Sequence, residues 1–279
     1  MSTLSLWVDE SERGSFLAIG GILVEWNQVP ALVDGWRNLK ASLGLDAGAE
    51  LKWNLPEDHP TRDALARLGR SAKDVAARAV QYLASESVSF VVVVMCDVRD
   101  LSKWRRIWQK ASVRDFYCEG LRYVLQRAAE EVAISGVGSC VVVCDTPELG
   151  RHSFALRSIR RGSRAVQEAY ADWYKRGVGL GPGGVHHDGT LRDAGFHPSI
   201  LVGDATYHDM LQMADVVVGA TGNWVAAIND GRGDPWMVQQ IGLLSSKFRA
   251  RYGTATFWGD GLVLWPPDHP LWKLLKESI

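Results

Sequence analysis

The chain has 279 residues, of which 47% are hydrophobic and 23% charged, and its formal net charge is −1 at pH 7. This length is ample for a buried core, and the composition is that of a globular protein. The near-neutral charge excludes a globally basic surface, so any contact with nucleic acid must come from a local patch.

Hydrophobic patterning predicts an N-terminal hairpin followed by alternating helices and strands. In chain order, we expect strands at 4–8 and 16–24, helices at 30–43 and 60–84, a strand at 88–97, a helix at 101–134, a strand at 139–145, a helix at 151–176, a strand at 197–204 and a helix at 207–228. This order predicts a single α/β domain over residues 1–279, with a mixed five-stranded sheet flanked by helices. A helical insertion at about 30–84 follows the second strand, and a C-terminal helix and hairpin extend over about 236–279.

Acidic residues stand where the predicted strands end, at Asp9–Glu10, Asp97, Asp145 and Asp204. The carboxyl ends of parallel strands share one edge of an α/β sheet, so these acids could point to a common place. A single Asp after a strand more often caps a helix or starts a turn, and Asp97 fits that explanation best. It does not explain Asp9 and Glu10, because a hairpin follows them. Alternation along a strand sends this pair to opposite faces, which leaves Glu10 a supporting role.

Asp215 is a further unusual acid, since it lies among apolar residues in "MLQMADVVVGA". A carboxylate on or near a buried helix face costs several kcal/mol unless it is paired or bound to metal. A cluster of such acids would favour hard divalent cations with oxygen ligands, Mg²⁺ or Mn²⁺. The Gly20–Gly21 pair in the second strand indicates either a close approach of another backbone or a β-bulge.

Several segments together resemble the bacterial family catalogued as domain of unknown function 3800. They are "WVDESERGSFLAIGGILV" at the N-terminus, "ELKW" at 50–53, "VVVCD" at 141–145 and "GDATYHDMLQMADVVVGA" at 203–220. The resemblance covers residues 6 to about 222 and rests on the ordered set rather than on one motif. Two positions depart from the family pattern: Glu12 stands where a Gly is usual, and Ala205-Thr206 replaces Ser-Lys.

The resemblance implies a ribonuclease-H-like fold in which Asp9, Asp145 and Asp215 are metal ligands. It implies Glu50 as the fourth acid, and Glu119 is the alternative because related folds often place this Glu on the first long helix. Supporting roles fall to Asp204, whose neighbours depart from the family pattern, and to Gln212 of the closing signature. Lys52 could hold a carboxylate or contact a substrate phosphate.

The function implied is a metal-dependent nuclease in which two ions, about 3.5–4 Å apart, act on a phosphodiester. The alternatives are a catalytically weak module that binds nucleic acid or protein, and a hydrolase of a small phosphorylated molecule. The sequence has no GxSxG elbow and no Cys-His pairing, so it offers no protein nucleophile. Family members often lie near phage-defence genes, which suggests a role in defence.

A basic segment supplies the expected contact with nucleic acid. In "RHSFALRSIRRGSRAVQEAY", Arg157, Arg160, Arg161 and Arg164 recur at helical spacing. They would form one face for phosphates, although a solvated helix face explains them equally well. We expect no membrane partner, because no apolar run approaches the roughly 18 residues of a membrane span. The four cysteines include no CxxC pair, which favours a cytoplasmic protein, and the Trp-rich tail can pack on its own chain or in a homodimer.

Overall fold

The computed structural model describes residues 2–100, 113–145, 162–178, 189–251 and 254–279. Their strands are β1 (Thr3–Arg13), β2 (Phe16–Glu25), β3 (Ser89–Met95), β4 (Ser139–Asp145), β5 (Leu201–Gly203) and β6 (Leu262–Trp265). Their helices are the 3-10 helix η1 (Trp26–Gln28) and α1 (Val29–Ser42), α2 (Pro60–Arg67), α3 (Ala72–Ser85), α5 (Val113–Ser135), α6 (Gly162–Arg176), α7 (Asp209–Asn229), α8 (Pro235–Ser245) and α9 (Leu271–Glu277). The prediction of an α/β chain that opens with a hairpin is confirmed.

The strands form one mixed sheet in the order β5-β4-β1-β2-β3-β6. The pairs β1–β2 and β2–β3 are antiparallel, whereas β4 is parallel to β1, β5 to β4 and β6 to β3. The described residues thus give six strands rather than the five predicted. The additional strand, β6, comes from the segment expected to form a C-terminal hairpin. Its four buried residues pair with the buried residues Val92–Met95 of β3, and the predicted hairpin is reduced to a single bridge between Trp258 and Leu262.

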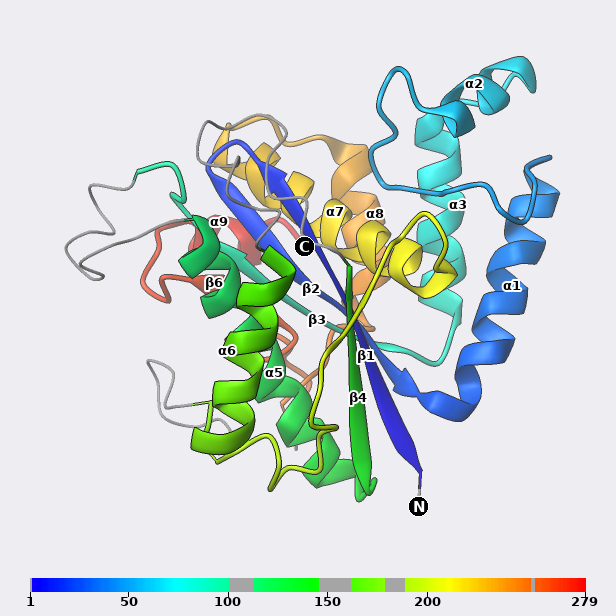
Figure 1. Cartoon of the computed structure of the whole chain (residues 1–279). Helices are drawn as coiled ribbons and strands as arrows, with labels where there is room; N and C mark the ends of the chain where they lie inside the picture. The colour runs from blue at the N-terminus through cyan, green and yellow to red at the C-terminus, as the bar shows by residue number, and fades with distance from the viewer. Residues whose placement is uncertain (1, 101–112, 146–161, 179–188, 252–253) are drawn as a thin grey trace.

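Helices cover both faces of the sheet, as Figure 1 shows: α5 and α6 lie on one side, and α1, α3, α7 and α8 on the other. The strand β3 explains why both faces are covered. Phe90, Val92 and Val94 belong to the core under α7, whereas Val91 and Val93 belong to the core under α5. A run of β-branched residues without polar alternation therefore predicts this two-sided burial correctly.

β1 continues beyond its predicted end at Asp9–Glu10 and reaches Arg13. It is longer because β2 provides ladder partners for the polar residues, with Asp9 opposite Gly20 and Arg13 opposite Phe16. The two acids consequently lie within a strand and have a fixed orientation. At the opposite edge of the sheet, β5 is not the buried strand that the sequence predicts, since it has three residues and Leu201 is 45% exposed.

The Gly20–Gly21 pair allows a close approach of backbones and does not mark a bulge, because the β1–β2 register is continuous through it. A Cβ on Gly20 would lie 2.1 Å from the carbonyl oxygen of Val91. A Cβ on Gly21 would lie 1.8 Å from the carbonyl oxygen of Trp7 and 3.3 Å from the Cβ of Ala214. The pair therefore lets the backbones of β1, β2 and β3 lie close together, and Gly21 also leaves room for Ala214 of α7.

The helical insertion between β2 and β3 consists of α1, α2 and α3. Residues 60–84 form two helices rather than one, because Gly69 has a positive φ of 67° and Ser71 caps the second helix by accepting the N–H of Asp74. The buried ammonium of Lys40 forms a 2.6 Å ion pair with Asp209 at the start of α7. The insertion is thereby fixed to the helix that carries Asp215.

Candidate functional site

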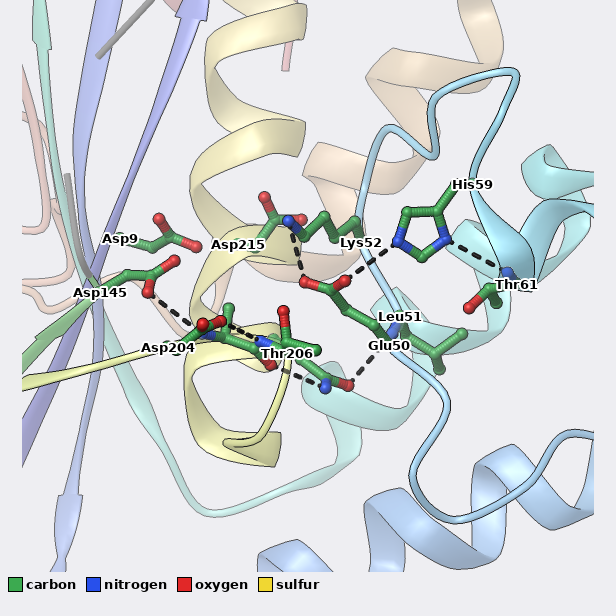
Figure 2. Close-up of polar contacts among 12 residues, drawn as sticks. Asp9, Glu50, Leu51, Lys52, His59, Thr61, Asp145, Asp204, Thr206 and Asp215 are labelled. Carbon is green, nitrogen blue, oxygen red and sulfur yellow. Dashed lines mark hydrogen bonds and ion pairs between the residues drawn. The ribbon is translucent and has the colours of Figure 1, made fainter. Parts of the chain in front are cut away.

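Three of the four predicted acids lie close together where β4 ends beside β1 (Figure 2). Asp9 lies within β1 and Asp145 ends β4. The parallel pairing of Val8 with Cys144 places these two acids beside each other in the ladder. Asp215 projects from α7 above the same face. Asp9 is only 6% exposed, and the other two are partly buried.

Electrostatic repulsion within this acid cluster (Asp9, Asp145 and Asp215) shows how close the carboxylates are. Burial, followed by repulsion from Asp215, Glu10 and Asp145, raises the pKa of Asp9 well above its ordinary value. Burial also raises the pKa of Asp215 to about 6, although the hydrogen bond from the Trp53 backbone opposes this shift. Burial and repulsion between the acids therefore disfavour their ionised forms when no cation is bound.

Each acid of the cluster is oriented by a backbone amide that donates to one of its oxygens. The donors are Glu10 N to Asp9 Oδ1 at 2.7 Å, Ala205 N to Asp145 Oδ1 at 3.1 Å and Trp53 N to Asp215 Oδ2 at 2.6 Å. These bonds fix the carboxylates from β1, from the loop after β5 and from the insertion. The cluster is therefore assembled by segments that are far apart in the sequence.

The extended segment 50–53 is attached to α7 through alternate residues. The N–H of Leu51 donates to Oε1 of Gln212 at 3.1 Å, and the N–H of Trp53 donates to Asp215 one helical turn later. The side-chain amide of Gln212 also donates to the Ala205 carbonyl at 2.9 Å. The supporting role expected of Gln212 thus has a structural basis, since it joins segment 50–53 to the loop that orients Asp145.

Glu50 is buried beside the cluster but is already paired. Its carboxylate lies 2.9 Å from the ammonium of Lys52 and 3.0 Å from Nε2 of His59 (Figure 2). Nδ1 of His59 accepts the N–H of Thr61 and caps α2, so the proton of a neutral ring is on Nε2 and points to Glu50. The Glu50 charge also contributes to raising the pKa of Asp215. Glu50 therefore lies next to the acid cluster, but its carboxylate is bound to Lys52 and His59.

The residues expected to support the site differ in their positions. By alternation along β1, Glu10 faces away from α7, where its charge helps to raise the pKa of buried Tyr117. Asp204 is exposed and accepts the N–H of Thr206 at 2.9 Å, as in an ordinary turn. Glu119, the alternative fourth acid, pairs with Arg122 on α5, whose core lies on the other side of the sheet. This placement leaves Glu50 as the fourth acid beside the cluster.

Carboxylate oxygens suit hard divalent cations, so the chemistry of the cluster fits Mg²⁺ or Mn²⁺. Within the ranges that the structure describes, however, no group of three His, Cys, Asp or Glu side chains is arranged to hold a metal ion. The acids are therefore neighbours rather than a preformed cage.

Most of the predicted basic face lies outside the described residues, namely Arg157, Arg160 and Arg161. Arg164 is at the start of α6, where its exposed side chain pairs with Glu168 at 2.8 Å. Exposed pairs of this kind contribute little to stability. Arg164 is therefore accessible to a ligand and is not committed to the core.

Sequence reasoning missed Arg13, which the structure places on the same face of β1 as Asp9. The electrostatic interaction between Arg13 and Asp215 shows that its guanidinium is near the cluster. Alternation at positions 9, 11 and 13 would have revealed it, had the strand been predicted to continue beyond Asp9. His59 was also missed, and no sequence signal connects it with Glu50.

Comparisons with protein-family models, curated proteins and solved structures give no match to this chain. The family resemblance therefore rests on the motifs alone. Among the described helices, none is both long enough and apolar enough to cross a membrane.

Proposed function

We propose that the chain is a metal-dependent phosphodiester hydrolase, acting as a nuclease on a ribonuclease-H-like sheet. The observation that carries this proposal is the meeting of Asp9, Asp145 and Asp215 on one face of the sheet, where burial and then the charges of its neighbours raise the pKa of Asp9. Acids with perturbed pKa values often mark functional sites, and carboxylate oxygens are the ligands that hard divalent cations prefer. A pure binding module gains nothing from burying such a cluster, which disfavours the alternative of a catalytically weak module.

The topology supports the fold part of the proposal. Three antiparallel strands, β1–β3, are followed by β4 and β5 parallel to β1. The acids stand on the first strand, the fourth strand and a late helix, in the chain order that the family resemblance implies. The extra strand β6 and helices α8 and α9 would be additions at the edge of this sheet.

The roles of the residues follow from their contacts. Asp9, Asp145 and Asp215 would hold Mg²⁺ or Mn²⁺, and their carboxylates would have to move closer together to do so. Such ions, when bound, lower the pKa of a coordinated water and stabilise charge on the leaving oxygen. Glu50 would join the ligands only if Lys52 released it. Lys52, whose pKa is raised by the hydrogen bond and charge of Glu50 despite opposing burial, then remains a cation available to a substrate phosphate.

A cleavage assay with matched variants tests the proposal. Labelled single-stranded, duplex and hybrid DNA and RNA are incubated with Mg²⁺ or Mn²⁺ and with the wild type, Asp9→Asn or Asp145→Asn. Asp204→Asn is the control, because it removes an acid nearby while keeping the turn acceptor. We expect cleavage by the wild type and the control and a loss of at least about 100-fold in the two cluster variants. Equal cleavage by all four proteins would identify a contaminant and refute the proposal.

A further inference from the structure

Arg13 is the last residue of β1 and is held rigidly in the hairpin. It pairs with Phe16 in the β1–β2 ladder, just before the turn at Gly14, whose φ is 58°. The side chain of Ser11 faces α7, because a Cβ on Gly222 of that helix would lie 3.9 Å from the Cβ of Ser11. Side chains two residues apart share a face, so Asp9, Ser11 and Arg13 all face α7.

The guanidinium of Arg13 is close to the acid cluster but is not bound to it. The charge of Asp215 favours its cationic form, although burial is the larger effect and lowers the pKa of Arg13. Its Nε is buried and has no hydrogen-bond partner within the described parts of the chain. In contrast, the ammonium of Lys52 is committed to Glu50 at 2.9 Å. Arg13 is therefore a cation whose donors are available beside the site.

Other buried guanidinium groups in the described ranges have at least one acceptor. Arg122 and Arg127 also leave Nε without a partner, but their terminal N–H groups donate to the carbonyls of Val178 and Gly259 at 3.1 and 2.9 Å. Arg249, which is 4% exposed, contacts the carboxylates of Glu130, Glu131 and Asp260 at 3.0, 3.1 and 3.4 Å. Arg13 differs from these groups, because the described ranges give its guanidinium no acceptor although it lies beside an acid cluster. It requires an acceptor, and a phosphate oxygen pair matches the planar fork of a guanidinium.

We propose that Arg13 binds a phosphate of the substrate chain that flanks the phosphodiester held at the acid cluster. The Cα atoms of Asp9 and Arg13 are about 13 Å apart along the strand. The guanidinium therefore lies beside the acid cluster and not within it, where it would meet a phosphate next to the reacting one. This inference rests on the proposed function and deepens it, because it specifies a polymeric nucleic acid in preference to a small phosphorylated molecule.

Binding and cleavage measurements on Arg13→Gln and Arg13→Lys test the inference. Arg99→Gln is the matched control, because Arg99 pairs with Glu12 near the same hairpin and its side chain is 63% exposed. Binding of a labelled 12-nucleotide single strand is followed by fluorescence anisotropy in Ca²⁺ at several salt concentrations. We expect Arg13→Gln to weaken binding about tenfold and to reduce the slope of log K against log salt by about 0.7. Arg13→Lys should restore the slope but only part of the affinity.

Cleavage of substrates of two lengths separates binding from folding. If Arg13 contacts only a flanking phosphate, Arg13→Gln should lower kcat/KM for the oligonucleotide at least tenfold more than for bis(p-nitrophenyl) phosphate. The latter substrate has no flanking phosphate. Equal losses on both substrates would indicate a structural role and overturn the inference. If the wild type shows Asp9-dependent cleavage while Arg13→Gln keeps wild-type affinity and salt slope, Arg13 is excluded and the proposed function stands. A wild type that neither binds nor cleaves refutes both.

Discussion

The backbone N–H of Trp53 donates a 2.6 Å hydrogen bond to Oδ2 of Asp215, although 162 residues separate the two in the chain. One oxygen of Asp215 thus secures segment 50–53, while the charge of the same carboxylate belongs to the acid cluster. Folding and the proposed metal binding would therefore depend on the same side chain through different properties. An asparagine preserves the acceptor and removes the charge, so substitution can separate the two contributions.

Asp215→Asn should be more stable than Asp215→Ala. Both variants remove the buried charge, but only the alanine variant leaves the Trp53 N–H without an acceptor, which should lower its free energy of unfolding by about 1–3 kcal/mol relative to the asparagine variant. The asparagine variant keeps the bond and removes the cost of burying the charge, so it should be at least as stable as the wild type at pH 7.5. Both should lose cleavage. Urea denaturation measures the difference, and an asparagine variant less stable than the alanine variant would contradict this assignment.

The stability of the metal-free protein should fall as pH rises. Burial raises the folded-state pKa of Asp215 from an ordinary 3.8 to about 6. The folded state therefore holds this proton more tightly than the unfolded chain, and stability is lost between about pH 4 and pH 6. Asp215→Asn should exceed the wild type by up to about 3 kcal/mol at pH 7.5 in EDTA, because one pKa unit is worth about 1.4 kcal/mol. Its advantage should vanish near pH 4. An advantage independent of pH would exclude this cause, and Asp204→Asn serves as the control.

Divalent cations should stabilise the wild type through the acid cluster. At a concentration about tenfold above Kd, Mn²⁺ should add about 1.4 kcal/mol, which corresponds to roughly 3–6 °C in Tm for a chain of this size. Asp9→Asn should lose the shift, and Asp204→Asn should keep it. Thermal denaturation with Mn²⁺ or EDTA at pH 7.5 provides the measurement. A shift of the same size in Asp9→Asn would place the ion elsewhere.

Gln212→Leu should loosen segment 50–53 without touching an acid. It removes the acceptor of the Leu51 N–H and the donor to the Ala205 carbonyl, so we expect a loss of at least about 2 kcal/mol in stability. Hydrogen exchange at Leu51 and Trp53 should accelerate more than in the core of β3. Asn223→Ala is the control, because Asn223 lies on the same helix, α7, and its substitution removes only a side-chain hydrogen bond to Asn54. Unchanged protection at Leu51 would show that Gln212 does not hold the segment.

Local patterns predict the parts of this fold whose partners are near in sequence or whose burial is complete. The runs 88–97 and 139–145 identify β3 and β4 because β-branched residues without alternation suit only a strand covered on both faces. β6 could not be recognised in this way. Its four residues gain their partner from β3, about 170 residues earlier, and nothing in their own pattern records that pairing.

The acids of the site could be predicted because a carboxylate among apolar residues, such as Asp215, conflicts with its surroundings. The pairing of Glu50 with Lys52 and His59 could not, because it depends on how segment 50–53 and α2 pack against each other. Arg13 was missed because the acids were taken as the end of β1, whereas the partner strand extends the ladder past them. Contacts between segments far apart in the sequence therefore determine the partners of Glu50 and the position of Arg13, which local charge patterns do not predict.

The attachment of segment 50–53 to α7 also determines when the site can form during synthesis. Glu50 and Trp53 leave the ribosome long before Gln212 and Asp215 exist, and at about 5–20 residues per second the delay is roughly 8–30 s. Until α7 emerges, Asp9 and Asp145 lack their third acid, and the insertion lacks the helix on which it rests. A nascent chain consequently carries no assembled acid cluster, and the site becomes complete only when the last quarter of the protein folds onto the first.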